Sequence, residues 1–200
     1  MAVDHFKVQH FALRSHEKMK EVLMNPKAKG PKNHYYMIRG GKDITNITVW
    51  EFGTIGGEYI KTYGHYHVGN LDENYWIVWG EGIALLQKRA VDKQGHPIDD
   101  EIEDFKAIKI KAGDKVYMPK NYGHLVVNIA KTYLTTADDS PVYFEEVDPI
   151  SLPGHADYEP IKKLKGFAYY VIEKNGKPEL IKNPNYKKVP KAKITLPNDQ

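Results

Sequence analysis

The sequence of 200 residues contains no cysteine. Disulfide bonds, thiolate metal sites and cysteine nucleophiles are therefore excluded. Nine histidines and five methionines are the soft metal ligands that remain. Any metal site in this protein must be built from imidazole and carboxylate groups.

Long apolar runs are absent as well. No segment reaches the roughly 18 apolar residues that a membrane span needs, and the start of the sequence, MAVDHFKVQHFALRSHEK, lacks the apolar core of a secretory signal. With 41% hydrophobic and 28% charged residues, the composition is that of one globular domain. We expect a soluble, cytoplasmic protein without a membrane partner.

Most of the chain has little excess charge of either sign. Residues 182–200 hold five lysines against one aspartate, a net charge of +4, so of the total of +3 the rest of the chain carries −1. A basic surface of the kind that binds nucleic acid is therefore not expected on the folded part. We interpret the lysines as a solvated tail.

One helix is predicted, over residues 14–24. Met19, Val22 and Leu23 have the i, i+3, i+4 spacing of a buried helix face, Ser15 suits the N-cap, and an Asn-Pro pair follows. No other segment of the chain has a comparable helical pattern.

Short β-type runs between turn signals follow the helix. The expected strands are residues 35–38, 46–51, 59–62, 64–68, 75–78, 83–88, 105–110, 115–118, 124–128, 132–136, 142–145, 167–172 and 179–181. Asn175-Gly176 suits a two-residue hairpin turn between the last two. Many strands without intervening helices favour an antiparallel sandwich, jelly roll or barrel. The proline-rich stretch at residues 148–164 is expected to be a long loop that could cover one end of it.

Two segments carry the residues with metal-binding chemistry. His65 and His67 are two apart, so on a strand both imidazoles point from the same face toward one ion. Glu73 begins the next expected strand, which we expect to form a hairpin with the first. His124, about 50 residues later, lies at the head of another strand. The histidine pair is a candidate metal site, and Glu73 and His124 are a carboxylate and a third imidazole that could add to it.

The spacing of these residues resembles the two motifs of the cupins. The first segment has H-x-H, five residues, Glu73, six residues and Gly80, and the second has Gly113, Pro119, His124 and Asn128 at the cupin spacings. The resemblance implies an all-β fold, a double-stranded β-helix or jelly-roll barrel, with one divalent metal held by His65, His67, Glu73 and His124. It also implies an arm with one helix at residues 1–34, a barrel at 35–181 and a tail at 182–200.

Within the cupins, the residues around the first motif look most like those of the archaeal and bacterial cupin-type glucose-6-phosphate isomerases. Thr62, Gly64 and the Leu-Asp, Glu-x-Tyr and Gly-Glu-Gly steps match that pattern, and a late Gly-His-Ala-Asp-Tyr element contains His155. The resemblance implies interconversion of glucose 6-phosphate and fructose 6-phosphate. The sugar-phosphate substrate would then contact a set of four residues: Thr48, Thr62 and Gly64 at the phosphate, and Tyr75 at a sugar hydroxyl.

The isomerase interpretation assigns chemistry to Glu73, to His155 and to the metal. Glu73 would move the proton between C1 and C2 through a cis-enediol, and His155 would assist ring opening or cover the site. The metal would act as a Lewis acid. We expect Fe2+, and an imidazole and carboxylate set also suits Mn2+, Ni2+ or Zn2+.

Several alternatives stay open at this level. The gap before Glu73 is one residue shorter than in the isomerases, which makes Asp72 a second candidate ligand, and Glu73 could be a ligand without being a base. A hydride shift could replace the enediol. The chain could also be a non-catalytic sugar-phosphate-binding cupin or a metal-dependent cupin oxygenase. The resemblance implies a homodimer, with Trp76 and Val78 as candidates for its contact surface or for packing on the second sheet.

Overall fold

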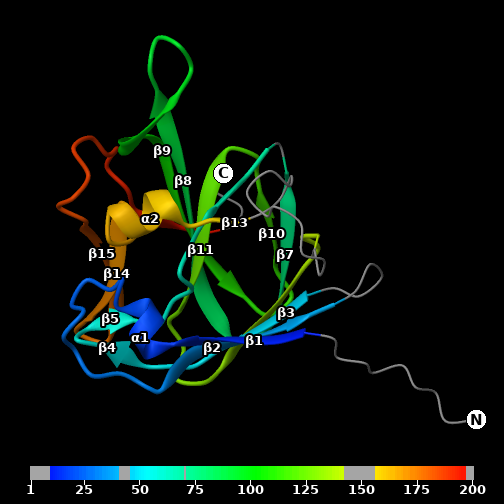
Figure 1. The fold of residues 1–200 in the computed structure, drawn as a ribbon. Helices are drawn as coiled ribbons and strands as arrows, with labels where there is room; N and C mark the ends of the chain where they lie inside the picture. Colours follow the sequence, from blue (N-terminus) through cyan, green and yellow to red (C-terminus); the bar gives the residue numbers. More distant parts are fainter. Residues whose placement is uncertain (1–9, 41–45, 70, 142–155, 197–200) are drawn as a thin grey trace, which may run out of the picture.

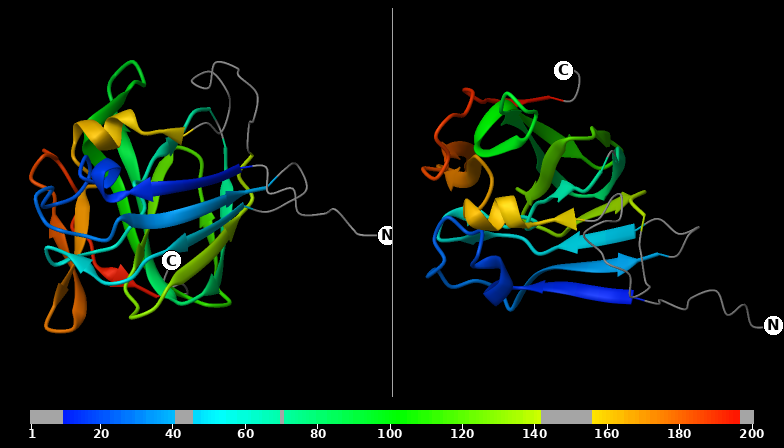
Figure 2. Two further views of the ribbon diagram at one scale, coloured as in Figure 1. Left: turned by 60° about the horizontal axis from the view of Figure 1, so that its bottom comes forward. Right: turned by 45° about the horizontal axis from the view of Figure 1, so that its top comes forward.

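Two sheets facing each other, antiparallel except for the pairing of their last C-terminal strand, form the body of the molecule (Figures 1 and 2). The computed structural model describes residues 10–40, 46–69, 71–141 and 156–196. The six-stranded sheet has the order β1 (His10–Ser15), β2 (Asn33–Arg39), β3 (Asn46–Trp50), β12 (Leu134–Asp138), β7 (Glu73–Trp79) and β10 (Lys115–Met118). The four-stranded sheet has the order β11 (Tyr122–Asn128), β8 (Glu81–Val91), β9 (Pro97–Lys111) and β16 (Ile194–Thr195).

The core lies between these two sheets. Residues of β3 alternate between buried and partly exposed positions, as period-2 geometry requires of a strand with one covered face. Trp50 and Ile77 from one sheet and Ile83, Leu85 and Ile108 from the other are almost completely buried. The expected all-β jelly-roll barrel is confirmed.

Two small sheets complete the structure. One contains β15 (Lys177–Lys182), β14 (Tyr169–Lys174), β5 (Glu58–Tyr59) and β4 (Thr54–Ile55), and the other pairs β13 (Ala156–Asp157) with β6 (Tyr66–His67). The predicted hairpin turn at Asn175-Gly176 is confirmed, since both residues have positive φ and Lys174 pairs with Lys177.

The strand prediction fails in one place that matters for the site. The strand at residues 64–68 was expected to form a hairpin with the strand that begins at Glu73, but β6 pairs with β13 while β7 pairs with β12 and β10. The reason is that His65 bridges to His124 of β11. The two segments therefore approach the barrel interior from different sheets. The expected strand at residues 142–145 lies outside the described residues.

The N-terminal helix is shorter than predicted. Helix α1 spans only His16–Met19, with Ser15 as its N-cap, whose hydroxyl accepts a hydrogen bond from the amide of Lys18 (3.3 Å). Val22 is fully buried, as expected, but its carbonyl accepts a hydrogen bond from Nζ of Lys61 (2.7 Å). The buried ammonium takes the place of a helical donor at this carbonyl, so a tertiary contact overrides the helical pattern.

A second helix was not expected. Helix α2 (Glu159–Lys163) lies in the stretch interpreted as a loop, with Pro160 in its first turn and Ile161 fully buried. Proline is well tolerated in a first helical turn because the amide it lacks would have no partner there. The proline that suggested a loop is instead part of the helix start.

The C-terminal lysines are exposed, but their segment is not a free tail. Tyr186 is buried and its hydroxyl donates to the carbonyl of Gly166 (2.9 Å), while Asn183 donates to the carbonyls of Leu164 and Phe167 (both 2.9 Å). Beyond them, β16 pairs in parallel with β9. The buried tyrosine and asparagine thus hold a charged segment against the body. No helix among the described residues is long and apolar enough to cross a bilayer.

Candidate metal centre

Three histidines converge inside the barrel. His67 lies in β6, His124 in β11, and His65, directly before β6, exchanges two backbone hydrogen bonds with His124 (3.2 and 3.0 Å). This bridge sets the imidazoles against one another, with ring centroids 4.5 to 5.1 Å apart. One nitrogen of each ring lies within 4.8 Å of the other two. The structure therefore brings the three predicted histidines together.

Glu73 joins the cluster from the opposite sheet. It begins β7 on the inner face, and its Oε2 lies 3.1 Å from Nε2 of His124 and 3.6 Å from Nε2 of His67. The nitrogen Nε2 of His65 lies 3.1 Å from that of His67. Both Oε2 of Glu73 and Nε2 of His124 are buried and have no hydrogen-bond partner within the described part of the chain.

This donor set fits a divalent transition metal. Ligand atoms at about 2.1 Å from one ion, at angles near 90 to 110°, lie about 3.0 to 3.4 Å from each other. The nearest separations in the cluster, 3.1 to 3.6 Å, are close to these values. Two buried polar atoms without partners are costly unless something else binds them. A cation is the ligand that suits nitrogen and oxygen lone pairs pointing at one place.

Burial sets the protonation states of the cluster. It lowers the pKa of His124 to about 4, and together with the neighbouring histidines it lowers the pKa of His65. Burial also raises the pKa of Glu73. The imidazoles are thus neutral near pH 7, the form in which they bind metals.

A second buried carboxyl group, missed in the sequence, lies beside Glu73. Asp138 is the last residue of β12, and its Oδ1 accepts hydrogen bonds from Asn46 Nδ2 (2.8 Å) and Ser140 Oγ (2.6 Å). Burial and the charge of Glu73 raise the pKa of Asp138 to about 6. The sequence could have indicated that Asp138 is buried only through strand alternation, because it lies two residues after Thr136 and therefore on the same face of the strand.

The alternative ligand Asp72 lies outside the cluster. Its side chain is exposed, and it accepts a hydrogen bond from the amide of Lys120 (2.7 Å). This hydrogen bond and one from Tyr117 lower the pKa of Asp72. Alternation along the strand explains the difference, because consecutive residues point to opposite faces.

Two of the predicted substrate residues lie next to the histidines. The hydroxyl of Thr62 accepts a hydrogen bond from the amide of Val126 (3.1 Å), which ties this segment to β11. Gly64 has φ of 79°, and a Cβ there would lie 3.2 Å from Leu125. The conformation and the close approach both favour glycine at this position.

The remaining predicted residues are more scattered. Tyr75 follows Glu73 on the inner face, and its ring centroid lies 5.6 Å from that of His124. Thr48 is buried on the inner face of β3, opposite Met37 and Thr136. His155 lies outside the described residues.

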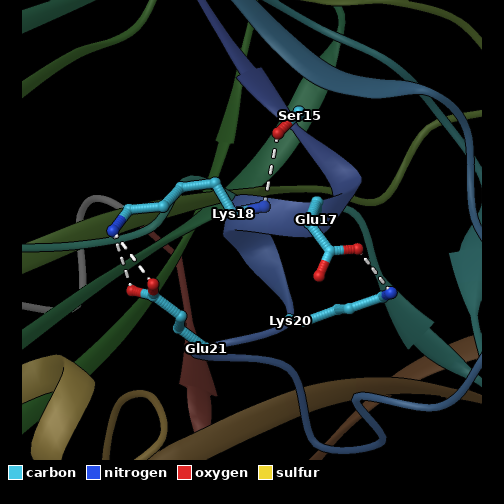
Figure 3. A pocket seen from close by; sticks show the side chains of 5 residues that line it. All are labelled: Ser15, Glu17, Lys18, Lys20 and Glu21. Atoms are coloured by element: carbon cyan, nitrogen blue, oxygen red, sulfur yellow. Dashed lines mark hydrogen bonds and ion pairs between the residues drawn. The ribbon is translucent and has the colours of Figure 1, made fainter.

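A separate hollow lies on the outer surface at α1. Figure 3 shows its lining residues, Ser15, Glu17, Lys18, Lys20 and Glu21. The two lysines and two glutamates neutralise one another, with Lys18 2.9 Å from Glu21 and Lys20 2.6 Å from Glu17. No charge is left over for a ligand, so we assign this hollow no function.

The chain is similar to a set of archaeal enzymes. It is 36% identical over 143 residues to the glucose-6-phosphate isomerase of Pyrococcus furiosus and 33% identical over 141 residues to that of Thermococcus onnurineus. These matches cover 70% of this chain, and the chain spans 63% and 62%, respectively, of the length of these two relatives. A solved structure described as a predicted oxalate decarboxylase from Thermotoga maritima is 19% identical over 56% of this chain and 81% of that chain, with a TM-score of 0.35, too distant to bear on function.

A family model covers the barrel and both segments of the metal cluster. The model described as glucose-6-phosphate isomerase (GPI) matches residues 24–189. This range includes all four residues of the cluster and most of the chain. The chain therefore belongs to the glucose-6-phosphate isomerase family.

Proposed function

We propose that this protein is a metal-dependent isomerase that interconverts glucose 6-phosphate and fructose 6-phosphate. The observation that carries the proposal is the convergence of three neutral histidines and Glu73 inside the barrel, with two buried donor atoms that lack partners. Membership of the isomerase family supports the choice of substrate. The archaeal relatives are named for the same reaction.

The residues His65, His67, Glu73 and His124 would hold the metal, and we propose Fe2+ as the ion. A divalent cation there would supply Lewis-acid stabilisation of negative charge on the substrate oxygens at C1 and C2. An imidazole and carboxylate set leaves positions open for such oxygens.

Glu73 is the group we propose for proton transfer. Its carboxylate takes the proton from C2 of the open-chain aldose and returns it to C1, while the hydroxyl proton on O2 passes to O1 through a cis-enediol. The raised pKa that burial causes suits this role, because it makes the carboxylate a stronger base toward the proton on carbon. Tyr75, on the same inner face, would donate a hydrogen bond from its hydroxyl to a sugar oxygen.

The phosphate end of the substrate would lie against the segment before the histidines. We propose that the hydroxyls of Thr48 and Thr62 and the amide of Gly64 donate hydrogen bonds to it. The absence of a side chain at Gly64 permits close approach of the backbone to phosphate oxygens. His155 is proposed as a cover for the site.

The turnover test couples glucose 6-phosphate formation from fructose 6-phosphate to a dehydrogenase. The metal-loaded protein is compared with the chelated protein and with the variant Glu73→Gln, which we expect to be about 100-fold slower or worse, the usual effect of losing a general base. Asp72→Asn is the matched control, because it removes a neighbouring carboxylate that is exposed, and it should retain activity and metal content.

Three outcomes would contradict the isomerase. Binding of fructose 6-phosphate without turnover would favour a sugar-phosphate-binding protein, and oxygen consumption with a substrate would favour an oxygenase. Absence of turnover with both fructose 6-phosphate and mannose 6-phosphate would also reject it. Loss of metal in Asp72→Asn but not in Glu73→Gln would reassign the carboxylate ligand.

We also propose that the protein is a homodimer joined through the outer face of the six-stranded sheet. Phe11 lies directly opposite Ile38 across β1 and β2, and both side chains are exposed, at 59% and 36%. Trp76 and Val78 extend this apolar face on β7, at 37% and 56%. An apolar face of this extent is typical of an interface. Sedimentation of wild type and of Phe11→Ser checks this, and a wild-type monomer at micromolar concentration would contradict it.

A further inference from the structure

The three arginines of the chain differ in how their charges are balanced. Arg89 forms an ion pair with Asp99 at 2.7 Å. The charge of Arg39 acts on the Asp138 carboxyl and opposes the rise in its pKa that burial and the charge of Glu73 cause. Arg14 has no carboxylate within 4.0 Å among residues 10–40, 46–69, 71–141 and 156–196. Its Nη2 donates to the hydroxyl of Tyr158 (3.2 Å), and its guanidinium also interacts with the hydroxyl of Tyr35. Its Nε is buried with no hydrogen-bond partner in the same residues.

Arg14 lies on the inner side of the six-stranded sheet, beside the candidate site. It is directly opposite the buried Tyr35 in the pairing of β1 with β2. The Tyr35 hydroxyl accepts a hydrogen bond from the amide of Tyr63 (3.3 Å). Tyr63 stands between Thr62 and Gly64 in the chain. Arg14 is therefore one tyrosine away from the segment proposed to bind phosphate.

The tyrosine that holds Arg14 also contacts the histidine cluster. The ring of Tyr158 lies 5.5 Å from the ring of His65 and 5.2 Å from that of Tyr63, measured between centroids. The charge of Arg14 also acts on His65 and contributes to lowering its pKa. The guanidinium is thus connected to the histidine cluster through the ring of Tyr158.

A half-buried guanidinium without a counterion is unfavourable, because desolvation of a charge is repaid only by an opposite charge and by hydrogen bonds. Arginine has a planar fork of donors that matches a phosphate group. We propose that Arg14 binds the phosphate dianion of the hexose-phosphate substrate and makes the site selective for phosphorylated sugars. This inference rests on the proposed function, which supplies the hexose phosphate. Threonine hydroxyls and the glycine amide are neutral donors, so Arg14 would supply a positive charge to this subsite.

The competing interpretation is that Arg14 only packs on an aromatic ring, since its guanidinium carbon lies 5.5 Å from the centre of the Tyr158 ring. Binding measurements separate the two. Calorimetric titration of the metal-free protein with inorganic phosphate, and of the metal-loaded protein with fructose 6-phosphate and with fructose, is compared between wild type and Arg14→Gln.

We expect Arg14→Gln to weaken binding of inorganic phosphate and fructose 6-phosphate by ten- to a hundredfold, the range of a charge-assisted hydrogen bond lost. Fructose binding should not change, and in turnover KM should rise while kcat changes little. Lys20→Gln is the matched control. It removes one positive charge six residues away on the outer surface (Figure 3), and it should leave all affinities at the wild-type value. Wild-type affinity of Arg14→Gln for both phosphate compounds would overturn the proposal.

A measurement on the wild-type protein covers the case in which Arg14→Gln does not fold. Three arginines give three Nε signals in a nitrogen NMR spectrum, and the signal missing from Arg14→Lys is that of Arg14. It should shift on addition of fructose 6-phosphate and of phosphate but not of fructose, and no shift with the phosphate compounds would overturn the proposal. If the Arg14 signal shifts while fructose 6-phosphate is not turned over, the phosphate site stands and the isomerase fails. If fructose 6-phosphate is turned over equally well by wild type and Arg14→Gln, the isomerase stands and the phosphate site at Arg14 fails.

Discussion

Two groups of histidines lie in the described part of the chain, and of these two one has the character of a metal site. In the first, Nδ1 of His16 lies 2.9 Å from Nε2 of His34, and Nε2 of His16 lies 3.0 Å from the carbonyl oxygen of Ala28. In the second, the nitrogens of His65, His67 and His124 converge with Glu73. In the first group, both nitrogens of His16 and Nε2 of His34 have partners, and Nδ1 of His34 alone is buried without one. In the second group, the unpartnered atoms Nε2 of His124 and Oε2 of Glu73 lie 3.1 Å apart and face one another.

The charges around the two groups have opposite signs. Burial, the nearby His16 and the charge of Lys61 lower the pKa of His34 to about 4, and a neighbouring ammonium repels a metal ion as it repels a proton. The second group has Glu73 within it and Asp138 beside it. The comparison shows that buried histidines suit a metal where a carboxylate supplies negative charge and several ligand atoms converge on one place.

The largest expected effect concerns metal affinity, because it tests this contrast directly. His124→Ala removes a ligand and should lower metal affinity by at least about 100-fold, since changes even to outer-shell partners cost 10- to 100-fold. His34→Gln changes a buried histidine of the other group and should retain the wild-type metal content. Elemental analysis after dialysis, with titration of the metal-free proteins, measures both. Equal loss in the two variants would show that the groups are not distinct.

The next effect concerns the cation beside the first group. Lys61 and Glu58 form a buried ion pair at 2.5 Å, with side chains 3% and 0% exposed. Lys61→Met leaves Glu58 unpaired and should lower the free energy of unfolding by about 3 to 5 kcal/mol, measured by urea denaturation. The double variant with Glu58→Gln should recover part of this loss.

The control for that measurement is Lys88→Met. Lys88 pairs with Glu103 at 3.2 Å, but both side chains are exposed, and such pairs contribute at most about 1 kcal/mol. If Lys61→Met lowers the free energy of unfolding no more than Lys88→Met does, the buried ion pair beside His34 contributes no more to stability than an exposed one.

The smallest effect is a pH dependence of stability. Because the folded-state pKa of His34 is about 4 and the ordinary value is 6.5, the unfolded chain binds more protons between these values. Stability is therefore complete above pH 6.5 and falls as the pH is lowered toward 4, by about 2 to 3 kcal/mol for this group. In the metal-free protein, urea denaturation at pH 7 and pH 4.5 should show a smaller drop for His34→Gln than for wild type. An identical drop would assign the dependence to other groups.

The sequence determined the all-β class by local rules, and its resemblance to the cupin motifs predicted which residues would form the cluster. Alternation along strands placed His65 with His67 on one face and Glu73 on the inner face, and spacing brought His124 to the head of a strand. The hairpin at Asn175-Gly176 followed from turn chemistry in the same way. The hairpin and the alternation of strands could be predicted because each needs only neighbours a few residues apart.

Only the tertiary structure decided the pairings and the charges. The sequence placed β6 beside β7, but the bridge from His65 to His124 puts them on different sheets, and the helix predicted over residues 14–24 ends at Met19, where contacts from Lys61 follow. Asp138 and Arg14 were not recognised as site residues, because an inward-facing charge on a strand has meaning only once its surroundings are known. Burial and the presence or absence of a counterion depend on residues far apart in the chain, and local patterns do not contain them.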